Sequence, residues 1–503
     1  MKKTILLSGI ALCFAIASCK KDYLNTTPTD KVKADAVFTS VENATSVLNG
    51  IYRYMFQRTD ATTSNAQGKP GVGGILLGLD FMGEDLHQVN ATWFTSTGEG
   101  NWIAPRTDTH ASNLYYYRTF FRMIGNANFI LDHIDNVTGT DDGKARVKAE
   151  ALVLRAYAYS YLVQLYGKRY DANNKPNAQL AVPLLLTSTD TKKPRISVEE
   201  IYTAINKDLD AAIALNQTNR LNKSHSNIWI AKGLKARVAL TMQDYQTAID
   251  FAKQVIDGGA FPLMDQTAYQ SGFNNAPALS EVMWAMMPNA EQGDTFGSFF
   301  AQIAYNANTS YQRGTPKLIN KALYDQIPAT DVRKKMWEAA PTATNFPLPS
   351  TAFARVPYMS RKYAVKNVGD PSLGDVPLMR SAEMYLILAE AYAKLATPQN
   401  GLAQDALFVL TSKRDASAVK SSNTGASLIN EILFNRRIEL WGEGFRYPDL
   451  KRLNLALDRT VVPNFTSTSV SNVMLIPAGD NKWQFLIPRS EIDANPNIGP
   501  QNP

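Results

Sequence analysis

Apolar residues recur at spacings of three and four along most of this 503-residue chain, and the segments with this pattern come in pairs. Such spacing is typical of amphipathic α-helices. The predicted helices run over residues 41–55, 114–134, 145–166, 198–215, 229–242, 245–256, 382–395 and 403–414. Because one pair of helices cannot bury its apolar face alone, the pairs are expected to stack and to share a continuous core.

Two of these helix pairs resemble tetratricopeptide units. In the pair over 229–256, Ala236, Ala239, Ala248 and Ala252 place small side chains where two antiparallel helices must approach closely. The pair over 382–414 has an Ala-Glu-Ala sequence in its first helix. The sequence therefore predicts a mainly α fold built on a tetratricopeptide-like scaffold.

Two long segments break the helical pattern. Residues 58–74 contain four glycines without a following Gly-Lys-Ser/Thr, which predicts a flexible connection and not a phosphate-binding loop. Between about 280 and 376, short apolar runs alternate with Gly, Asn, Pro and Thr, which predicts loops and a few short strands. We expect an N-terminal helical region over 36–275 and a C-terminal region over 276–503 that holds this loop-rich, minor-β excursion.

Composition excludes several classes of protein. The two cysteines, Cys13 and Cys19, both lie within the first twenty residues, so neither a disulfide framework nor a Cys-based metal site can exist in the body of the chain. The four histidines are scattered without metal-ligand spacing, so no metal or other cofactor is indicated. The formal net charge of +7 is spread without a Lys/Arg run, which gives nucleic-acid binding little support.

The N-terminus has the pattern of a lipoprotein leader. Two lysines precede the apolar run 5–16, and Ala17-Ser18 stands directly before Cys19. The run is too short to span a bilayer, and its context predicts a signal peptide over 1–18. The position of Cys19 resembles the bacterial lipobox, in which the cysteine is acylated, and residues 19–35 would form the lipidated tether. The alternative is an ordinary secretory signal with an incidental cysteine.

Several motifs follow one another in the order typical of one family. Asp22-Tyr23-Leu24 stands after Cys19, residues 155–159 read Arg-Ala-Tyr-Ala-Tyr, and the stretch from Arg436 to Arg446 reads RRIELWGEGFR. Together these motifs resemble the SusD/RagB-like outer-membrane lipoproteins of Bacteroidota, over nearly the whole chain. Asn435, where the family usually has Glu, is a departure that leaves the scaffold assignment intact.

This resemblance implies a lipid-anchored, surface-exposed outer-membrane protein that binds a nutrient. Its implied partner is a SusC-type TonB-dependent transporter, and its implied ligand is an oligosaccharide. No catalysis and no cofactor are implied. The alternatives are a RagB-like subunit that binds peptides and a lipid-anchored tetratricopeptide scaffold for protein partners, with a glycoside hydrolase as a third hypothesis.

Four charged residues near the C-terminus, Arg436, Glu439, Glu443 and Arg446, are spaced three, four and three. If one helix persists through Gly442, they share one helix face as alternating charges. We interpret them as a structural ion network, because flanking arginines lower the pKa of a carboxyl group, whereas a general acid needs a raised pKa. The alternative is a paired-carboxylate catalytic site.

The polar segment 83–106 lies outside the predicted helices and contains two tryptophans. An exposed indole face can stack on a sugar ring while polar neighbours bind its hydroxyls. The alternative is that each indole packs a loop onto the scaffold. The ligand-binding candidates of this segment are Asp85, Asn90, Trp93, Asn101, Trp102 and Arg106, and a later loop with Phe299, Tyr305 and Tyr311 is expected to supply the opposite wall.

Overall fold

The computed structural model describes residues 37–58, 68–90, 95–368, 372–465 and 467–503. The predicted signal peptide, Cys19 and Trp93 lie outside the described residues. Within those ranges, no helix combines the length and the apolar character needed to cross a membrane.

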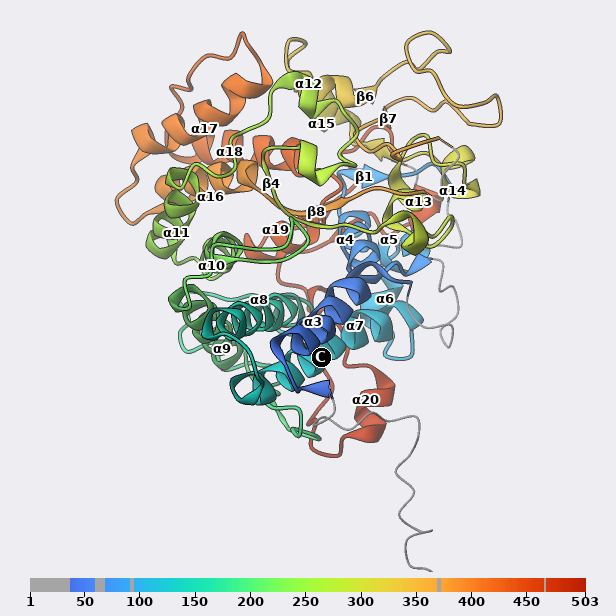
Figure 1. Cartoon of the computed structure of the whole chain (residues 1–503). Coiled ribbons are helices and arrows are strands. Elements are labelled where there is room, and N and C mark those ends of the chain that lie inside the picture. Colours follow the sequence, from blue (N-terminus) through green and yellow to red (C-terminus); the bar gives the residue numbers. More distant parts are fainter. Residues whose placement is uncertain (1–36, 59–67, 91–94, 369–371, 466) are drawn as a thin grey trace, which may run out of the picture.

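The scaffold is a continuous stack of helices (Figure 1). Its members are α3 (Val41–Phe56), α7 (Ala111–His133), α8 (Asp141–Tyr166), α9 (Val198–Ala214), α10 (Ile228–Thr241), α11 (Tyr245–Asp257), α16 (Ser381–Lys394), α17 (Asn400–Arg414) and α18 (Gly425–Glu439). From α7 to α11 each helix packs on the next, α16 then packs on α11, and α17 and α18 pack on α16. The predicted mainly α, tetratricopeptide-like fold is confirmed.

Local signals explain why the helices begin where they do. The Ser40 hydroxyl accepts a hydrogen bond from the Asn43 amide at 3.3 Å at the start of α3. Ser197 and Glu200 form a reciprocal capping box at the start of α9. These side chains satisfy amide groups that have no partner within the helix.

The pair α10–α11 shows why small residues matter in this stack. Ala236, Ala239, Ala248 and Ala252 are all at most 2% exposed. Their small side chains allow the two antiparallel helices to approach closely, and the chain turns between them at Gln243, whose φ is +61°. The pair then packs on α16, mainly through α11.

The prediction of a flexible connection over 58–74 is wrong in its last part. Residues Gly71–Phe81 form α4, and every residue of this helix is buried. A Cβ on Gly74 would lie 2.7 Å from the Tyr115 hydroxyl oxygen, and one on Gly78 would lie 2.0 Å from that of Tyr116. These glycines therefore serve close packing of α4 against α7. Residues 59–67 lie outside the described residues.

The excursion between α11 and α16 contains short strands, as expected, and also short helices that were not predicted. Its elements are α12 (Gln266–Tyr269), β4 (Val282–Met286), α13 (Phe299–Ile303), α14 (Ser310–Arg313), β5 (Leu318–Ile319), α15 (Lys321–Asp325), β6 (Trp337–Glu338), β7 (Met359–Ser360) and β8 (Val376–Arg380). Strand β4 pairs antiparallel with β8, with Val282 opposite Arg380. Because β8 runs directly into α16, the excursion is fastened to the scaffold at both ends.

The segment 83–106 is more helical and more buried than its sequence suggested. It contains β1 (Leu86–His87), α5 (Thr95–Gly100) and α6 (Ile103–Arg106). Strand β1 extends the small sheet of the excursion, whose order is β1-β5-β7-β6. The remaining pairing elements are β2 (Leu180–Pro183) with β3 (Arg195–Ser197) and β9 (Leu457–Asp458) with β10 (Leu475–Ile476), and the last helices are α19 (Arg446–Arg452) and α20 (Arg489–Ala494).

A buried ion cluster joins the excursion to the C-terminal helices. It contains the cations Arg333, Lys362, Arg380 and Arg414 and the anions Glu281, Asp331, Glu439 and Glu443. Arg380 donates to Glu439 Oε1 at 2.9 Å and to Glu443 Oε1 at 2.6 Å, and it also pairs with Glu281. Four positive and four negative groups therefore compensate one another away from water.

No single helix face holds Arg436, Glu439, Glu443 and Arg446, because the condition for it, a helix that persists through Gly442, is not met. Helix α18 ends at Glu439, and Gly442, whose φ is +80°, turns the chain before α19 begins at Arg446. Each of the four side chains is instead paired with a residue from elsewhere or from the next helix. Arg436 pairs with Asp449, Arg446 pairs with Glu84, and the two glutamates belong to the ion cluster.

Candidate functional site

Trp102 does not present a ring face to solvent. It is 3% exposed, and its indole packs edge-on against Trp483 at 4.8 Å between ring centroids. Its indole N–H donates to the Met82 carbonyl at 3.2 Å. The indole thus holds its loop onto the scaffold, which was the alternative to an exposed platform, and the platform expectation is corrected at this position.

Most of the polar candidates around Trp102 form hydrogen bonds or ion pairs within the protein. Arg106 donates to the carbonyl oxygens of Gln484 at 2.7 Å and Pro503 at 2.6 Å. Asp85 is buried and pairs with Arg437 and Arg446. Asn101 accepts a hydrogen bond from the Ile103 amide, and Asn90 is exposed. The structure therefore does not gather these residues into one site.

The carboxylates near Arg446 are poor candidates for acid catalysis. Burial alone would raise the pKa of Glu439, but Arg414, Arg380 and Arg333 hold that pKa well below its ordinary value. Arg437 and Arg446 likewise outweigh burial and lower the pKa of Asp85. A general acid needs a raised pKa, so these carboxylates are suited to ion pairing.

The later aromatic candidates lie near a different opening. Phe299 is buried and lines a recess at the end of α3, whereas Tyr305 packs against Phe346. Tyr311 is buried, and burial raises its pKa to about 12, with Arg58 and Asp294 as its charged neighbours. Two of the three predicted aromatic residues therefore stand at or beside one recess.

This recess has a volume of about 240 Å³ and lies between the end of α3 and two segments of the excursion. Its polar lining includes Arg58, whose guanidinium Nε donates to Asp294 Oδ2 at 2.7 Å. Asp294 also accepts from the Gly297 amide at 2.8 Å, so its carboxylate holds the loop over 288–298 in place. Phe56 and Phe299 supply aromatic lining, and Phe296, between Asp294 and Gly297 in sequence, is 44% exposed.

The charges of the recess are balanced. Arg53 and Arg58 face Glu291 and Asp294, and Gln292 adds a carboxamide. Guanidinium, carboxylate and carboxamide groups together can donate to and accept from hydroxyl groups, while aromatic rings contact apolar faces. This combination suits a neutral, hydroxyl-rich ligand.

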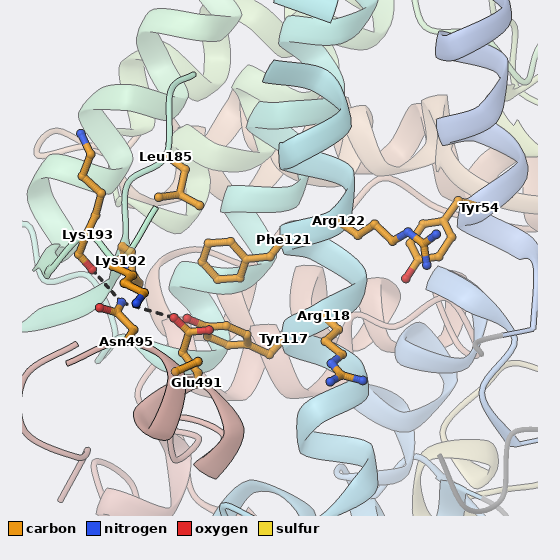
Figure 2. Close-up of a pocket in the computed structure, with 12 residues that line it drawn as sticks. Tyr54, Tyr117, Arg118, Phe121, Arg122, Leu185, Lys192, Lys193, Glu491 and Asn495 are labelled. Carbon is orange, nitrogen blue, oxygen red and sulfur yellow. Dashed lines mark hydrogen bonds between the residues drawn. The ribbon is translucent and has the colours of Figure 1, made fainter. Parts of the chain in front are cut away.

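A larger cavity of about 680 Å³ lies between α3, α7, the β2–β3 connection and α20 (Figure 2). Its floor is aromatic, with Tyr117 and Phe121 from α7. Its rim carries several basic side chains, so it differs from the recess in charge.

Two family models match the chain. One, described as "Starch-binding associating with outer membrane", matches residues 22–240, and the SusD family model matches residues 297–503. The chain belongs to the SusD family. A similar curated relative of this SusD-family protein is SusD-like protein P2 of Formosa agariphila, which is 25% identical over 420 residues covering 76% of this chain and 79% of the relative.

Solved structures share the fold over nearly the whole SusD-family chain. A SusD-like carbohydrate binding protein from Bacteroides vulgatus is 25% identical, with a TM-score of 0.77 over 92% of this chain and 98% of its own. A SusD superfamily protein from Bacteroides thetaiotaomicron is also 25% identical, with a TM-score of 0.76 over 92% and 100% of the two chains. The helical scaffold is thus that of the SusD family.

Sequence reasoning missed Arg58 and Asp294, the two charged groups at the mouth of the recess. They are 236 positions apart in the SusD-family chain, and each lies in a segment without periodicity. The polar composition of residues 288–298 predicts a loop but does not predict which residues the loop contacts. Pairing across such a distance depends on how the excursion folds back on α3.

Proposed function

We propose that this protein is a surface glycan-binding lipoprotein that delivers oligosaccharides to a SusC-type TonB-dependent transporter. Its role is binding and not catalysis. The observation that supports the proposal most strongly is the match to SusD-family models, one of them described as starch-binding, over most of the chain. The printed name of the Bacteroides vulgatus structure, a carbohydrate binding protein, supports the same ligand class.

We place the neutral glycan in the recess that Arg58 and Asp294 border. Arg58 is 38% exposed and Asp294 25% exposed at the side chain, so both can reach a ligand. A sugar ring would stack on Phe296, and its hydroxyl groups would bind the guanidinium, the carboxylate and Gln292. Asn90, which is exposed, and Trp93, which lies outside the described residues, remain proposed ligand-binding residues.

Arg58→Gln is expected to weaken binding of a neutral oligosaccharide about tenfold or more, because a hydrogen bond to a charged group contributes about 1.5–3 kcal/mol. The melting temperature should stay nearly unchanged, since a partly exposed ion pair stabilises a fold by at most about 1 kcal/mol. A panel of neutral gluco-, galacto- and xylo-oligosaccharides identifies the ligand, and calorimetric titration measures the affinity.

Lys253→Gln provides the matched control, because Lys253 pairs with Asp257 on the exposed face of α11, away from the recess. It should leave the affinity unchanged. Phe296→Ala should weaken binding several-fold through lost stacking. If no oligosaccharide of the panel binds the parent protein, binding of neutral glycans is refuted, and if Arg58→Gln binds like the control, the recess is not the site.

The anchor is proposed to be the acylated Cys19. Replacement by Ala should leave a folded protein that no longer fractionates with the outer membrane, because the acyl chains supply the hydrophobic attachment. Membrane fractionation should be done in cells that lack the transporter, so that binding to the transporter cannot hold the variant. Cys19→Ala protein that stays in the outer-membrane fraction of such cells would contradict the lipid anchor.

A further inference from the structure

The cavity between α7 and α20 has an excess of positive charge. Arg118, Arg122, Lys192 and Lys193 line it, and Glu491 supplies the one carboxylate of its lining. The recess of the proposed neutral site, by contrast, has equal numbers of arginines and carboxylates. A cavity of about 680 Å³ lies within the range of about 300–1,000 Å³ typical of ligand sites.

The two arginines lie one turn apart on α7. Like charges at this spacing repel each other, so their proximity is unfavourable in the free protein. In the part of the chain that the structure describes, Arg118 forms no ion pair or hydrogen bond. Arg122 lies over the Tyr54 ring, 4.7 Å from its centroid, which fixes the guanidinium plane and leaves its N–H edge for an acceptor.

The opposite wall of the cavity, which carries Lys192 and Lys193, is held by hydrogen bonds from two asparagine side chains to its backbone. The Asn495 carboxamide donates to the Lys193 carbonyl at 3.0 Å, and the Asn497 carboxamide donates to the Lys192 carbonyl at 2.8 Å. The ammonium group of Lys193 pairs with Asp190, whereas that of Lys192 forms no hydrogen bond or ion pair among the described residues. Figure 2 shows Phe121 between the side chain of Arg122 and the segment that carries Lys192.

The floor of the cavity contains an unused hydroxyl group. Tyr117 is 4% exposed, and its hydroxyl has no hydrogen-bond partner among the described residues. Its charged neighbours are Glu491, which lies beside it in Figure 2, and Arg195. A buried hydroxyl without a partner is costly, so a ligand that supplies one is favoured.

We propose that this cavity is a second binding site, for a sugar unit that carries a carboxylate or sulfate group. The oxyanion would bind Arg118 and Arg122, which donate paired N–H groups to such acceptors, with Lys192 on the opposite side. The sugar ring would lie on Phe121 and Tyr117, and the Tyr117 hydroxyl would gain a partner. This inference rests on the proposed function in taking the ligand to be a glycan.

Two matched pairs of probes test the site. Tetragalacturonate and its methyl ester differ in carboxylate charge, and a sulfated galactan tetrasaccharide and its desulfated form differ in sulfate charge. We expect the charged member of at least one pair to bind at least tenfold more tightly, and its affinity to fall as salt rises. Which pair shows the difference tells whether carboxylate or sulfate is recognised.

The double variant Arg118→Gln/Arg122→Gln should weaken binding of the charged probe at least tenfold. The control Lys253→Gln/Lys413→Gln removes the same charge from exposed positions on α11 and α17. It should change the affinity for the charged probe less than twofold. Tyr117→Phe should keep the melting temperature and lose several-fold in affinity. Equal binding by the cavity and control variants, or no preference for the charged member of either pair, would overturn the proposal.

The recess variant separates this inference from the proposed function. Arg58→Gln should weaken the neutral glycan and leave the charged probe bound in the cavity. If neutral glycans bind at the recess while no probe shows a charge preference, only the second site is refuted. If neither neutral nor charged glycans bind anywhere, glycan binding itself is refuted together with the second site.

Discussion

Replacing Arg380 by Met is expected to lower the free energy of unfolding by at least about 3–5 kcal/mol, the cost of removing one partner from a buried ion pair. Arg380 is fully buried and binds three carboxylates, those of Glu281, Glu439 and Glu443. Methionine fills a similar volume without charge, so the carboxylates would stay buried with too few cations. Urea denaturation of the purified variant, or its failure to accumulate as soluble protein, measures the effect.

The control for Arg380→Met is Lys253→Met. Lys253 and Asp257 also form an ion pair, at 2.6 Å, but their side chains are 56% and 58% exposed. Exposed pairs contribute little, so this change should leave the free energy of unfolding nearly unchanged. An Arg380→Met protein as stable as the Lys253→Met protein would show that the cluster is not what holds the excursion to the scaffold.

Truncation of Trp102 is expected to cost about 3–5 kcal/mol of stability, as for other buried tryptophans. Its ring contacts Trp483 and lies 6.0 Å from the Tyr447 ring, so Trp102→Ala opens a void among the aromatic residues. Binding of a neutral glycan, measured below the lowered melting temperature, should be the same as in the parent.

Trp102→Phe makes the experiment decisive, because it keeps an aromatic ring and should lose much less stability than Trp102→Ala. Thermal denaturation and calorimetric titration of both variants separate packing from binding. Reduced affinity in a Trp102→Phe protein of normal stability would mean that the indole contacts the ligand after all.

The scaffold was predictable because its signals are local. The spacing of Val41, Leu48 and Met55 and the cap at Ser40 depend only on neighbours in sequence, and α3 appears where they indicate. The prediction of a flexible connection around Gly74 failed because glycine has two uses that look alike in sequence. It can form a flexible link, or it can allow two helices to come into close contact. Only the position of Tyr115 on α7 shows which use applies.

The candidate sites depend on contacts that local patterns do not contain. Trp102 lies in a polar stretch, yet its partner Trp483 comes from near the other end of the chain. The break after Glu439 could have been predicted from Gly442 and Gly444, since two glycines within three residues weaken a helix. The pairing of Arg58 with Asp294 could not have been predicted, because neither segment shows hydrophobic periodicity.

The ion cluster also affects the order in which this chain can fold. Helix hairpins form quickly from contacts close in sequence, whereas distant contacts must first overcome the entropy of closing a long loop. Arg380 is 99 positions from Glu281 and 59 from Glu439, and Arg414 is 133 positions from Glu281. Glu281 therefore has no ion-pair partner from Arg380 or Arg414 until these residues, which are synthesised much later, are present. Although most helix pairs of the scaffold are neighbours in sequence, the ion cluster can be completed only after the segments that carry Arg380, Arg414 and Glu439 have been synthesised.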